Sequence, residues 1–331
     1  LATGEMVAAY CLTEPEAGSD AAGIKSRAVR DEERGVYILN GSKLWITNGG
    51  IANFFTVFAK EALTDENGET VDKISAFIVT RDMKGVSTGK EESKLGIKAS
   101  STAAVFFEDV EVPFENLLGQ RGKGFKVAME ILNSGRLGLA GGALGGLKAL
   151  LEITIEHITQ RKQFRKFLSQ FELIKEKTAH IAIDLFVAES MVYLTTAMID
   201  RGDVDYSLES AMCKIKATEV ALEGSNECLQ MAGGMGYMKE YPYERFLRDA
   251  RINTIFEGTN EILRLFVCLS GIQERGEYLK KIGHAEVRCI EDFIADNTAR
   301  GQPLGCEFDL ETIGELGGNF YGGTVAGKLI G

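Results

Sequence analysis

One carboxylate in the sequence stands where acid–base chemistry is expected. Residues 255–262 read Ile-Phe-Glu-Gly-Thr-Asn-Glu-Ile, which puts Glu257 at a turn just before residues that commonly begin a helix. An ordinary helix cap explains the same pattern without chemistry. The three histidines, His157, His180 and His284, offer little competition, because the first two fall in helical patterns where a structural role is expected. A carboxylate is therefore the more economical base.

Four other segments offer binding groups, each with a structural alternative. Residues 13–20 form a polar loop whose hydroxyl and N–H groups suit a ring edge or a phosphate, although most such loops are turns. Trp45, the only tryptophan, suits either stacking on a flat cofactor or core packing. Residues 161–164 (Arg-Lys-Gln-Phe) suit a pyrophosphate or form a solvated charge cluster. Residues 230–236 fit a glycine-capped helix end, which leaves Gln230 unexplained.

Composition limits the classes of function. The 331 residues carry a net charge of −11 with a pI near 5.0, which argues against a broad basic face for nucleic acid. The six cysteines show no C-x-x-C pair and no histidine at zinc-ligand spacing, so we expect no metal site and a reducing compartment. No run approaches about 18 apolar residues, so no transmembrane segment is expected.

The elements that must position these residues change type along the chain. The first third predicts short strands without βαβ alternation or a G-x-G-x-x-G motif, at residues 36–39, 43–47, 54–59, 74–79 and 103–112. Asn40-Gly41 and Asn48-Gly49-Gly50 are expected turns. Helical periodicity follows at 125–132, 135–151, 173–201, 207–231 and 260–272, and glycines in the second of these predict an irregular helix or a close backbone approach.

These elements predict an α+β fold. An antiparallel β-barrel or sandwich domain (1–115) precedes an antiparallel four-helix bundle (116–273), and no structure is assigned to the tail at 274–331.

Taken in order, the five segments resemble the acyl-CoA dehydrogenase family, and the stretch from Phe256 to Val267 resembles its very-long-chain branch. The resemblance runs from Leu1 to about Gln273 and covers the family's middle β-domain and C-terminal helical domain. The family's N-terminal helical domain is expected to be missing. Two residues depart from the family pattern: Arg165 replaces a usual glycine and Glu172 a usual glutamine.

The resemblance implies FAD as cofactor and Glu257 as the catalytic base. Some relatives carry the base at another position, which is Gly135 in this sequence, and a glycine cannot serve as a base. It implies FAD contacts by Tyr10, Leu12, Thr13, Gly18, Ser19, Trp45, Ile46, Thr47, Arg161, Gln163, Phe164, Gln230, Gly234, Thr259 and Glu261. It implies acyl-CoA contacts by Ser19, Asn133, Arg136, Phe256 and Gly258. Some FAD contacts are expected to come from a neighbouring subunit of a homodimer or homotetramer.

The implied activity is dehydrogenation of fatty acyl-CoA to trans-2-enoyl-CoA in fatty-acid β-oxidation, with electron-transferring flavoprotein as the electron acceptor. Two alternatives remain open: an acyl-CoA oxidase, and a non-catalytic assembly or scaffold protein with a vestigial flavin site. Intact Glu257, Arg161 and Gln230 argue against the scaffold. We expect a bacterial-type cytoplasmic location, with the mitochondrial matrix as the alternative.

Overall fold

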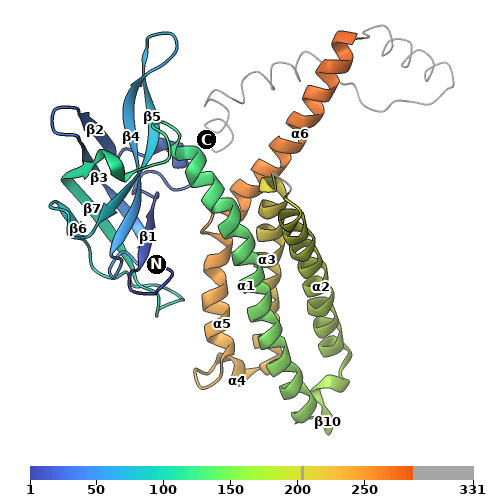
Figure 1. The fold of residues 1–331 in the computed structure, drawn as a ribbon. Coiled ribbons are helices and arrows are strands. Elements are labelled where there is room, and N and C mark those ends of the chain that lie inside the picture. Colours follow the sequence, from blue (N-terminus) through green and yellow to red (C-terminus); the bar gives the residue numbers. More distant parts are fainter. Residues whose placement is uncertain (203–204, 286–331) are drawn as a thin grey trace. The chain divides into compact units, whose positions relative to one another are not determined.

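The computed structural model describes residues 1–202 and 205–285, which fall into two compact units. Residues 1–263 form the first unit, which contains a β-sheet followed by packed helices (Figure 1). The second unit begins at Arg264, inside the last helix. The coarse α+β prediction is therefore confirmed. The last 46 residues of the expected tail, 286–331, lie outside the described residues.

In the described part of the chain, the sheet has eight strands, in the order β6-β7-β3-β2-β4-β5-β8, with β1 paired to β4 off this path. Buried and more exposed residues alternate along much of these strands, as expected of strands with one face on a core. The strands are β1 (Ala8–Cys11), β2 (Arg27–Asp31), β3 (Val36–Thr47), β4 (Phe54–Thr64), β5 (Thr70–Thr80), β6 (Val86–Thr88), β7 (Thr102–Pro113) and β8 (Leu117–Leu118).

Three details of the predicted sheet need correction. The closed-barrel alternative is wrong, because β6 and β8 end the strand path and no ladder joins them in the described part of the chain. The sheet is not purely antiparallel, since β4 pairs in parallel with β1 and β2. Asn40-Gly41 is not a turn but lies at a register shift within β3, where a Cβ on Gly41 would meet Ser26 Oγ at 2.1 Å.

Within residues 1–202 and 205–285, six α-helices follow the sheet. They are α1 (Gly124–Gln160), α2 (Glu172–Asp200), α3 (Ser207–Ala232), α4 (Gly234–Tyr237), α5 (Tyr243–Ala250) and α6 (Asn260–Ala285). Short 3-10 turns are η1 (Ala21–Gly23), η2 (Phe114–Asn116), η3 (Leu168–Gln170) and η4 (Arg251–Thr254). Helix α1 is continuous, so the alternative of an irregular helix at residues 135–151 is wrong. A Cβ added to its glycines at 138, 141, 142 and 145 would meet nothing within 4 Å, and their backbone still completes the helix.

Two hydrophobic clusters hold the sheet and the helices, and a third joins them. The helical core is built from α1, α2, α3 and α5, with Leu147, Leu185 and Val220 among its members. The joining cluster brings Leu12 and Phe58 from the sheet side against Ala128 of α1. Helix α1 begins against β5, where a Cβ on Gly124 would meet the Ser75 carbonyl carbon at 2.5 Å. Glycine is thus required for this close approach.

Among the helices of the described residues, α1 and α2 are long and apolar enough to cross a membrane by length and composition alone. The core helix of a soluble protein passes the same test, so the observation is weak. Helix α1 places a row of leucines in the helical core, which accounts for its apolar character.

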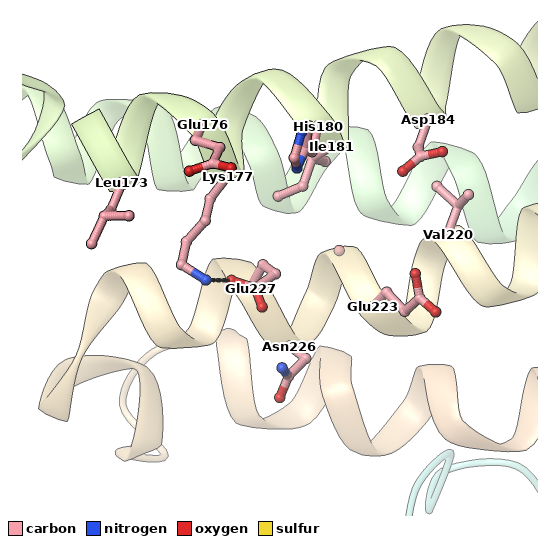
Figure 2. Close-up of a pocket in the computed structure, with 11 residues that line it drawn as sticks. Leu173, Glu176, Lys177, His180, Ile181, Asp184, Val220, Glu223, Asn226 and Glu227 are labelled. Carbon is pink, nitrogen blue, oxygen red and sulfur yellow. Dashed lines mark hydrogen bonds and ion pairs between the residues drawn. The ribbon is translucent and has the colours of Figure 1, made fainter. Parts of the chain in front are cut away.

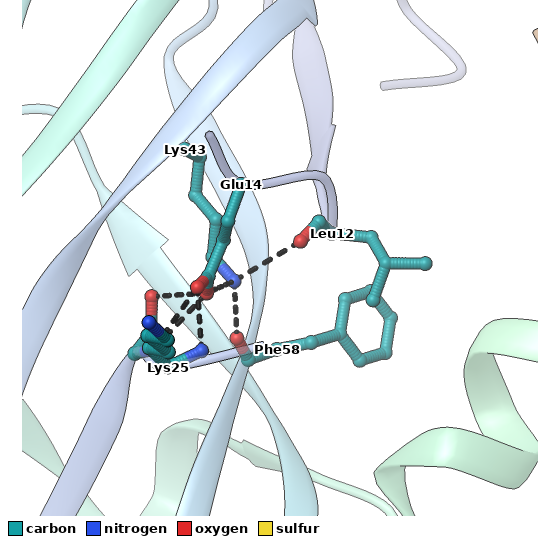
Figure 3. A network of polar contacts seen from close by, with 6 residues as sticks. Leu12, Glu14, Lys25, Lys43 and Phe58 are labelled. Carbon is teal, nitrogen blue, oxygen red and sulfur yellow. Dashed lines mark hydrogen bonds and ion pairs between the residues drawn. The ribbon is translucent and has the colours of Figure 1, made fainter. Parts of the chain in front are cut away.

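A buried ion pair fixes the loop that follows β1 (Figure 3). The Lys43 ammonium is completely buried and donates to Glu14 Oε1 at 2.7 Å, Phe58 O at 2.7 Å and Leu12 O at 3.2 Å. Glu14 also accepts from the Ser26 hydroxyl at 2.6 Å. Burial alone would raise the pKa of Glu14, but Lys43 and the hydrogen bonds lower it overall. Lys43 therefore ties the loop to strands β3 and β4.

We expect Lys43→Met to destabilise the protein by about 3–5 kcal/mol, because the Glu14 carboxylate would stay buried without its cation. Denaturant unfolding measures this change. Lys25→Met is the matched control, since Lys25 pairs with Glu16 on the surface with its side chain 72% exposed. Equal unfolding midpoints for the two variants would contradict the structural role of Lys43.

Candidate functional site

Glu257 lies in a tight turn between η4 and α6 that cations from two helices hold in place. The backbone is left-handed at both Glu257 (φ 59°) and Gly258 (φ 87°), which is unfavourable for a residue with a side chain. Arg136 Nε of α1 donates to Glu257 O at 3.1 Å. Lys214 Nζ of α3 donates to Gly258 O at 2.8 Å. The turn is therefore fixed by its surroundings.

Glu257 is half-buried as a residue, but the Oε2 atom of its carboxyl group is buried and has no hydrogen-bond partner among the described residues. A Cβ on Gly135 would lie 3.1 Å from this atom, so glycine keeps α1 clear of the carboxyl. Burial raises the pKa of Glu257, while Arg136 and Lys214 oppose the shift. A buried carboxyl with an unused acceptor and a raised pKa is typical of a functional group.

Other predicted residues gather around this carboxyl. Burial and the charge of Glu257 raise the pKa of Tyr10 on β1, whose hydroxyl lies 3.3 Å from Ala128 O. Asn133 Oδ1 accepts from Arg136 Nη1 at 2.9 Å. Burial lowers the pKa of the Arg136 guanidinium, which is only 8% exposed. Residues from β1, α1, α3 and one turn thus converge on Glu257.

The loop at residues 12–19 presents some of its predicted residues and buries others. Leu12 is buried, whereas Gly18 and Ser19 are exposed. The loop meets β3 where Leu44 N–H donates to Thr13 O at 3.0 Å. Next to this contact, Trp45 has a left-handed backbone (φ 55°) and is 61% exposed, which excludes the core-packing alternative. Thr47 is also exposed.

Ile46 contributes differently from its two neighbours. Ile46 belongs to the sheet core and is 3% exposed, so its side chain faces the core and not a ligand. Thr259 caps the start of α6, where its Oγ1 accepts from Ile262 N–H at 3.3 Å, and Glu261 of the same first turn is exposed. The capping alternative for this segment is therefore confirmed alongside the buried carboxyl.

A second group of predicted residues lies far from Glu257. Arg161 caps the C-terminal end of α1, about 37 Å along the helix from Arg136 at 1.5 Å per residue. It leads into a hairpin of β9 (Lys162–Gln163) and β10 (Lys166–Phe167), whose two-residue turn exposes 88% of Phe164. Phe164 and Arg165 both have left-handed backbones (φ 51° and 63°), a conformation that glycine adopts more easily.

Gln230 lies near the far end of α3, about 24 Å along that helix from Lys214, and Gly234 begins α4 soon after it. Gly233 ends the helix with φ 63°, and its N–H donates to Leu229 O and Gln230 O, both at 3.1 Å. This geometry confirms glycine capping. The Gln230 side chain is exposed. The predicted residues therefore form two groups separated by the length of the helices.

A groove of about 490 Å³ between α2 and α3 includes none of the predicted residues (Figure 2). Its walls carry Glu176, Asp184 and Glu223 beside an ion pair between Lys177 and Glu227. His180 also lines it and is exposed. In the part of the chain that the structure describes, no three histidine, cysteine or acidic side chains are grouped to hold a metal ion.

Sequence reasoning missed Lys214, which is completely buried and bonded to the turn of Glu257. A signal was present, because Lys214 shares a helical face with the buried Ala211, Ala217, Thr218 and Ala221. A lysine on an apolar face needs a buried partner. Lys43 and Glu14 were missed as a pair, since their separation of 29 residues in the sequence hides their contact.

Comparisons with known proteins identify the relatives of this chain. Models of the acyl-CoA dehydrogenase middle domain and C-terminal domain match residues 9–110 and 122–269. The chain is 51% identical over 286 residues to the mitochondrial very long-chain specific acyl-CoA dehydrogenase of Bos taurus, covering 86% of this chain and 44% of the relative. It is 41% identical to the short-chain specific acyl-CoA dehydrogenase of Clostridium acetobutylicum, covering 81% of this chain and 69% of that protein.

A solved structure of the same family is also similar to this chain. The acyl-CoA dehydrogenase of Bacillus anthracis, complexed with FAD, superposes with a TM-score of 0.75 at 43% identity, covering 87% of this chain and 51% of that one. The chain thus spans less than half of the bovine relative's length but more than two thirds of the clostridial relative.

We expect Glu257→Gln to raise the melting temperature, relative to the unchanged protein, more at pH 8 than at pH 4. A carboxyl whose folded pKa is raised contributes stability that is complete below its unfolded pKa and is lost as pH rises through the folded pKa. The neutral amide avoids that loss. Thermal unfolding of both proteins across this range measures the effect. A difference in midpoint that does not change with pH would contradict it.

Proposed function

Because this chain belongs to the acyl-CoA dehydrogenase family, we propose that it oxidises fatty acyl-CoA thioesters to trans-2-enoyl-CoA with FAD as cofactor. The observation that supports this most is the buried carboxyl of Glu257, whose Oε2 has no hydrogen-bond partner among the described residues. The α-proton of a thioester is weakly acidic, so its removal needs a base held at a fixed position in a site with little water.

Glu257 Oε2 is the atom proposed to receive the α-proton. Burial raises the pKa of this carboxyl, which makes its ionised form a stronger base. Negative charge then grows on the thioester oxygen and needs a donor. The Glu257 N–H is suited to this, since it makes none of the hydrogen bonds found within the described residues. Base and donor would share one residue, which keeps their relative positions fixed.

The residues near Glu257 fit the flavin end of FAD. Trp45 presents an exposed indole beside the loop that carries Thr13, and this side-by-side placement suits the edge and face of a flat ring. The other proposed contacts with the flavin are those of Tyr10, Leu12, Gly18, Ser19, Ile46 and Thr47. When bound, FAD supplies the acceptor for the hydride that leaves the β-carbon.

The acyl-CoA contacts proposed are those of Ser19, Asn133, Phe256 and Gly258. Arg136 has a different role in our proposal from the one expected. Its guanidinium is almost fully buried and already donates to Glu257 O and Asn133 Oδ1. We therefore assign it to holding the turn rather than to the thioester itself.

The distant group is proposed to bind FAD of a second copy. This group lies too far along α1 and α3 to join Glu257 around one flavin. Its members are Arg161, Gln163, Phe164, Gln230 and Gly234. Thr259 and Glu261, at the start of α6, complete the proposed contacts of the dinucleotide, where the helix dipole favours phosphate.

Helix α2 supports a homodimer or homotetramer. It exposes a row of apolar side chains at helical spacing, of which Phe186 is 72% and Leu194 64% exposed. Ile183, Val187 and Tyr193 belong to the same row. Exposed apolar rows of this kind mark contacts with other proteins.

The remaining assignments are also proposals. Electron-transferring flavoprotein is the proposed acceptor, and fatty-acid β-oxidation is the proposed process. A middle domain at residues 1–115 followed by an antiparallel four-helix bundle is the proposed domain organisation. The relatives are both mitochondrial and bacterial, so the bacterial cytoplasm is proposed with the mitochondrial matrix as the alternative. Peroxide formation at full rate in air would instead select the oxidase alternative, and stable FAD-free complexes the scaffold.

We expect Glu257→Gln to keep the flavin absorbance of the purified protein but to abolish its bleaching by acyl-CoA under anaerobic conditions. The amide has no basic oxygen to receive the α-proton. Glu176→Gln, on the α2–α3 groove, is the matched control and should bleach like the unchanged protein. Normal bleaching of the Glu257 variant would remove this residue from the role of base.

We expect Arg161→Ala to lower the FAD retained after gel filtration more than it slows bleaching per bound flavin. The guanidinium at the end of α1 would lose its contact with the pyrophosphate of the neighbouring copy. Arg165→Ala removes an exposed cation from the same hairpin and serves as the control. Equal flavin content in the two variants would contradict the assignment of Arg161.

A further inference from the structure

Lys214 is an unusual residue in the interior of α3. Its side chain is completely buried, and its ammonium donates to Gly258 O and to Asn260 Oδ1, both at 2.8 Å. Burying an ammonium is costly unless it is well bonded. An apolar residue would fill the same space without that cost, so the two contacts need an explanation beyond packing.

Both partners of Lys214 closely follow Glu257 in the chain. Asn260 is 2% exposed, and its Nδ2 donates to Thr218 Oγ1 and Glu219 Oε1, each at 3.1 Å. Helix α3 thus contacts the start of α6 through Lys214, Thr218 and Glu219. Arg136 of α1 holds the other side of the turn at Glu257 O.

We propose that Lys214 is a positioning residue for Glu257, anchoring the left-handed Glu257–Gly258 turn to α3 and placing a positive charge near the carboxylate. The proposal rests on the proposed function of Glu257 as the base. Arg136 and Lys214 bond successive carbonyl groups from opposite helices, so the turn has little freedom to rotate once both contacts are made.

The charges around Lys214 define its electrostatic effect. Burial, then Arg136, lowers the pKa of Lys214 to about 8, while Glu257, Glu261 and Glu219 act in the opposite direction. In return, Lys214 opposes the raised pKa of Glu257. Tyr10, on β1, also interacts electrostatically with Glu257 and Arg136 of this cluster. Removing the Lys214 charge therefore raises the pKa of Glu257 further.

The test compares Lys214→Met with Lys216→Met. Lys216 lies on the same helix, and its ammonium pairs with Asp184 at 2.6 Å near the surface. In the FAD-loaded protein, Lys214→Met should slow flavin bleaching per bound flavin by at least about tenfold, because the base is misplaced. The rising limb of the rate against pH should also move to higher pH, since Glu257 must ionise to act. Lys216→Met should change neither.

Hydrogen exchange gives a readout that does not depend on activity. The amides of residues 255–263 should exchange faster in Lys214→Met than in Lys216→Met, because one anchor of the turn is gone. Lys214→Arg keeps the charge and should leave the pH limb in place while the rate still falls. If Lys214→Met does not fold, the arginine variant still supplies the rate and the hydrogen-exchange measurements.

The proposal is overturned if Lys214→Met lowers only the melting temperature or the flavin content, while its pH limb and the exchange of residues 255–263 match those of Lys216→Met. If Lys214→Met does not fold, the proposal is overturned when Lys214→Arg matches the unchanged protein in both rate and exchange. If the unchanged protein shows no flavin bleaching, the proposed function is contradicted instead. The comparison of hydrogen exchange between Lys214→Met and Lys216→Met then still tests whether Lys214 positions the turn.

Discussion

The left-handed turn at Glu257 is the constraint on which the rest of the site depends. An L-residue is unfavourable in this conformation, so the turn persists only because other groups hold it. Arg136 and Lys214 do this from two different helices, and both must lie in the interior to reach it. The packing of α1 against α3 is therefore also a requirement of the site, because it sets the separation of the two cations.

A buried lysine also holds irregular backbone on the sheet side of the molecule. Lys43 is buried under the loop at residues 12–19 and bonds two backbone carbonyls and one carboxylate. In both places a lysine fixes irregular backbone that regular hydrogen-bond ladders do not reach. Such contacts are specific in geometry, since the ammonium donates to three acceptors at Lys43 and to two at Lys214. The two loops that face the proposed flavin are thus held by charge, while the apolar clusters hold the elements behind them.

Much of this arrangement could be predicted from the sequence. The helix that runs to Asp200 and the one that starts at Ser207 were placed within one residue at those ends, because their periodicity is strong. Strand β2 was missed, and Asn40-Gly41 was taken for a turn, because local composition does not reveal a bulge inside a long strand. Glu257 was found through its neighbours in the chain. Lys214 was not, because its partners lie 44 and 46 residues away.

Helix α1 runs uninterrupted from Arg136, which contacts the turn of Glu257, to Arg161, a residue proposed to bind FAD of a second copy. If FAD bridges two copies as proposed, cofactor binding and self-association are thermodynamically linked, and each strengthens the other by the same factor. Dilution would then release the cofactor even though the reactive carboxyl stayed intact. Enzyme concentration itself would set how much of the protein is competent.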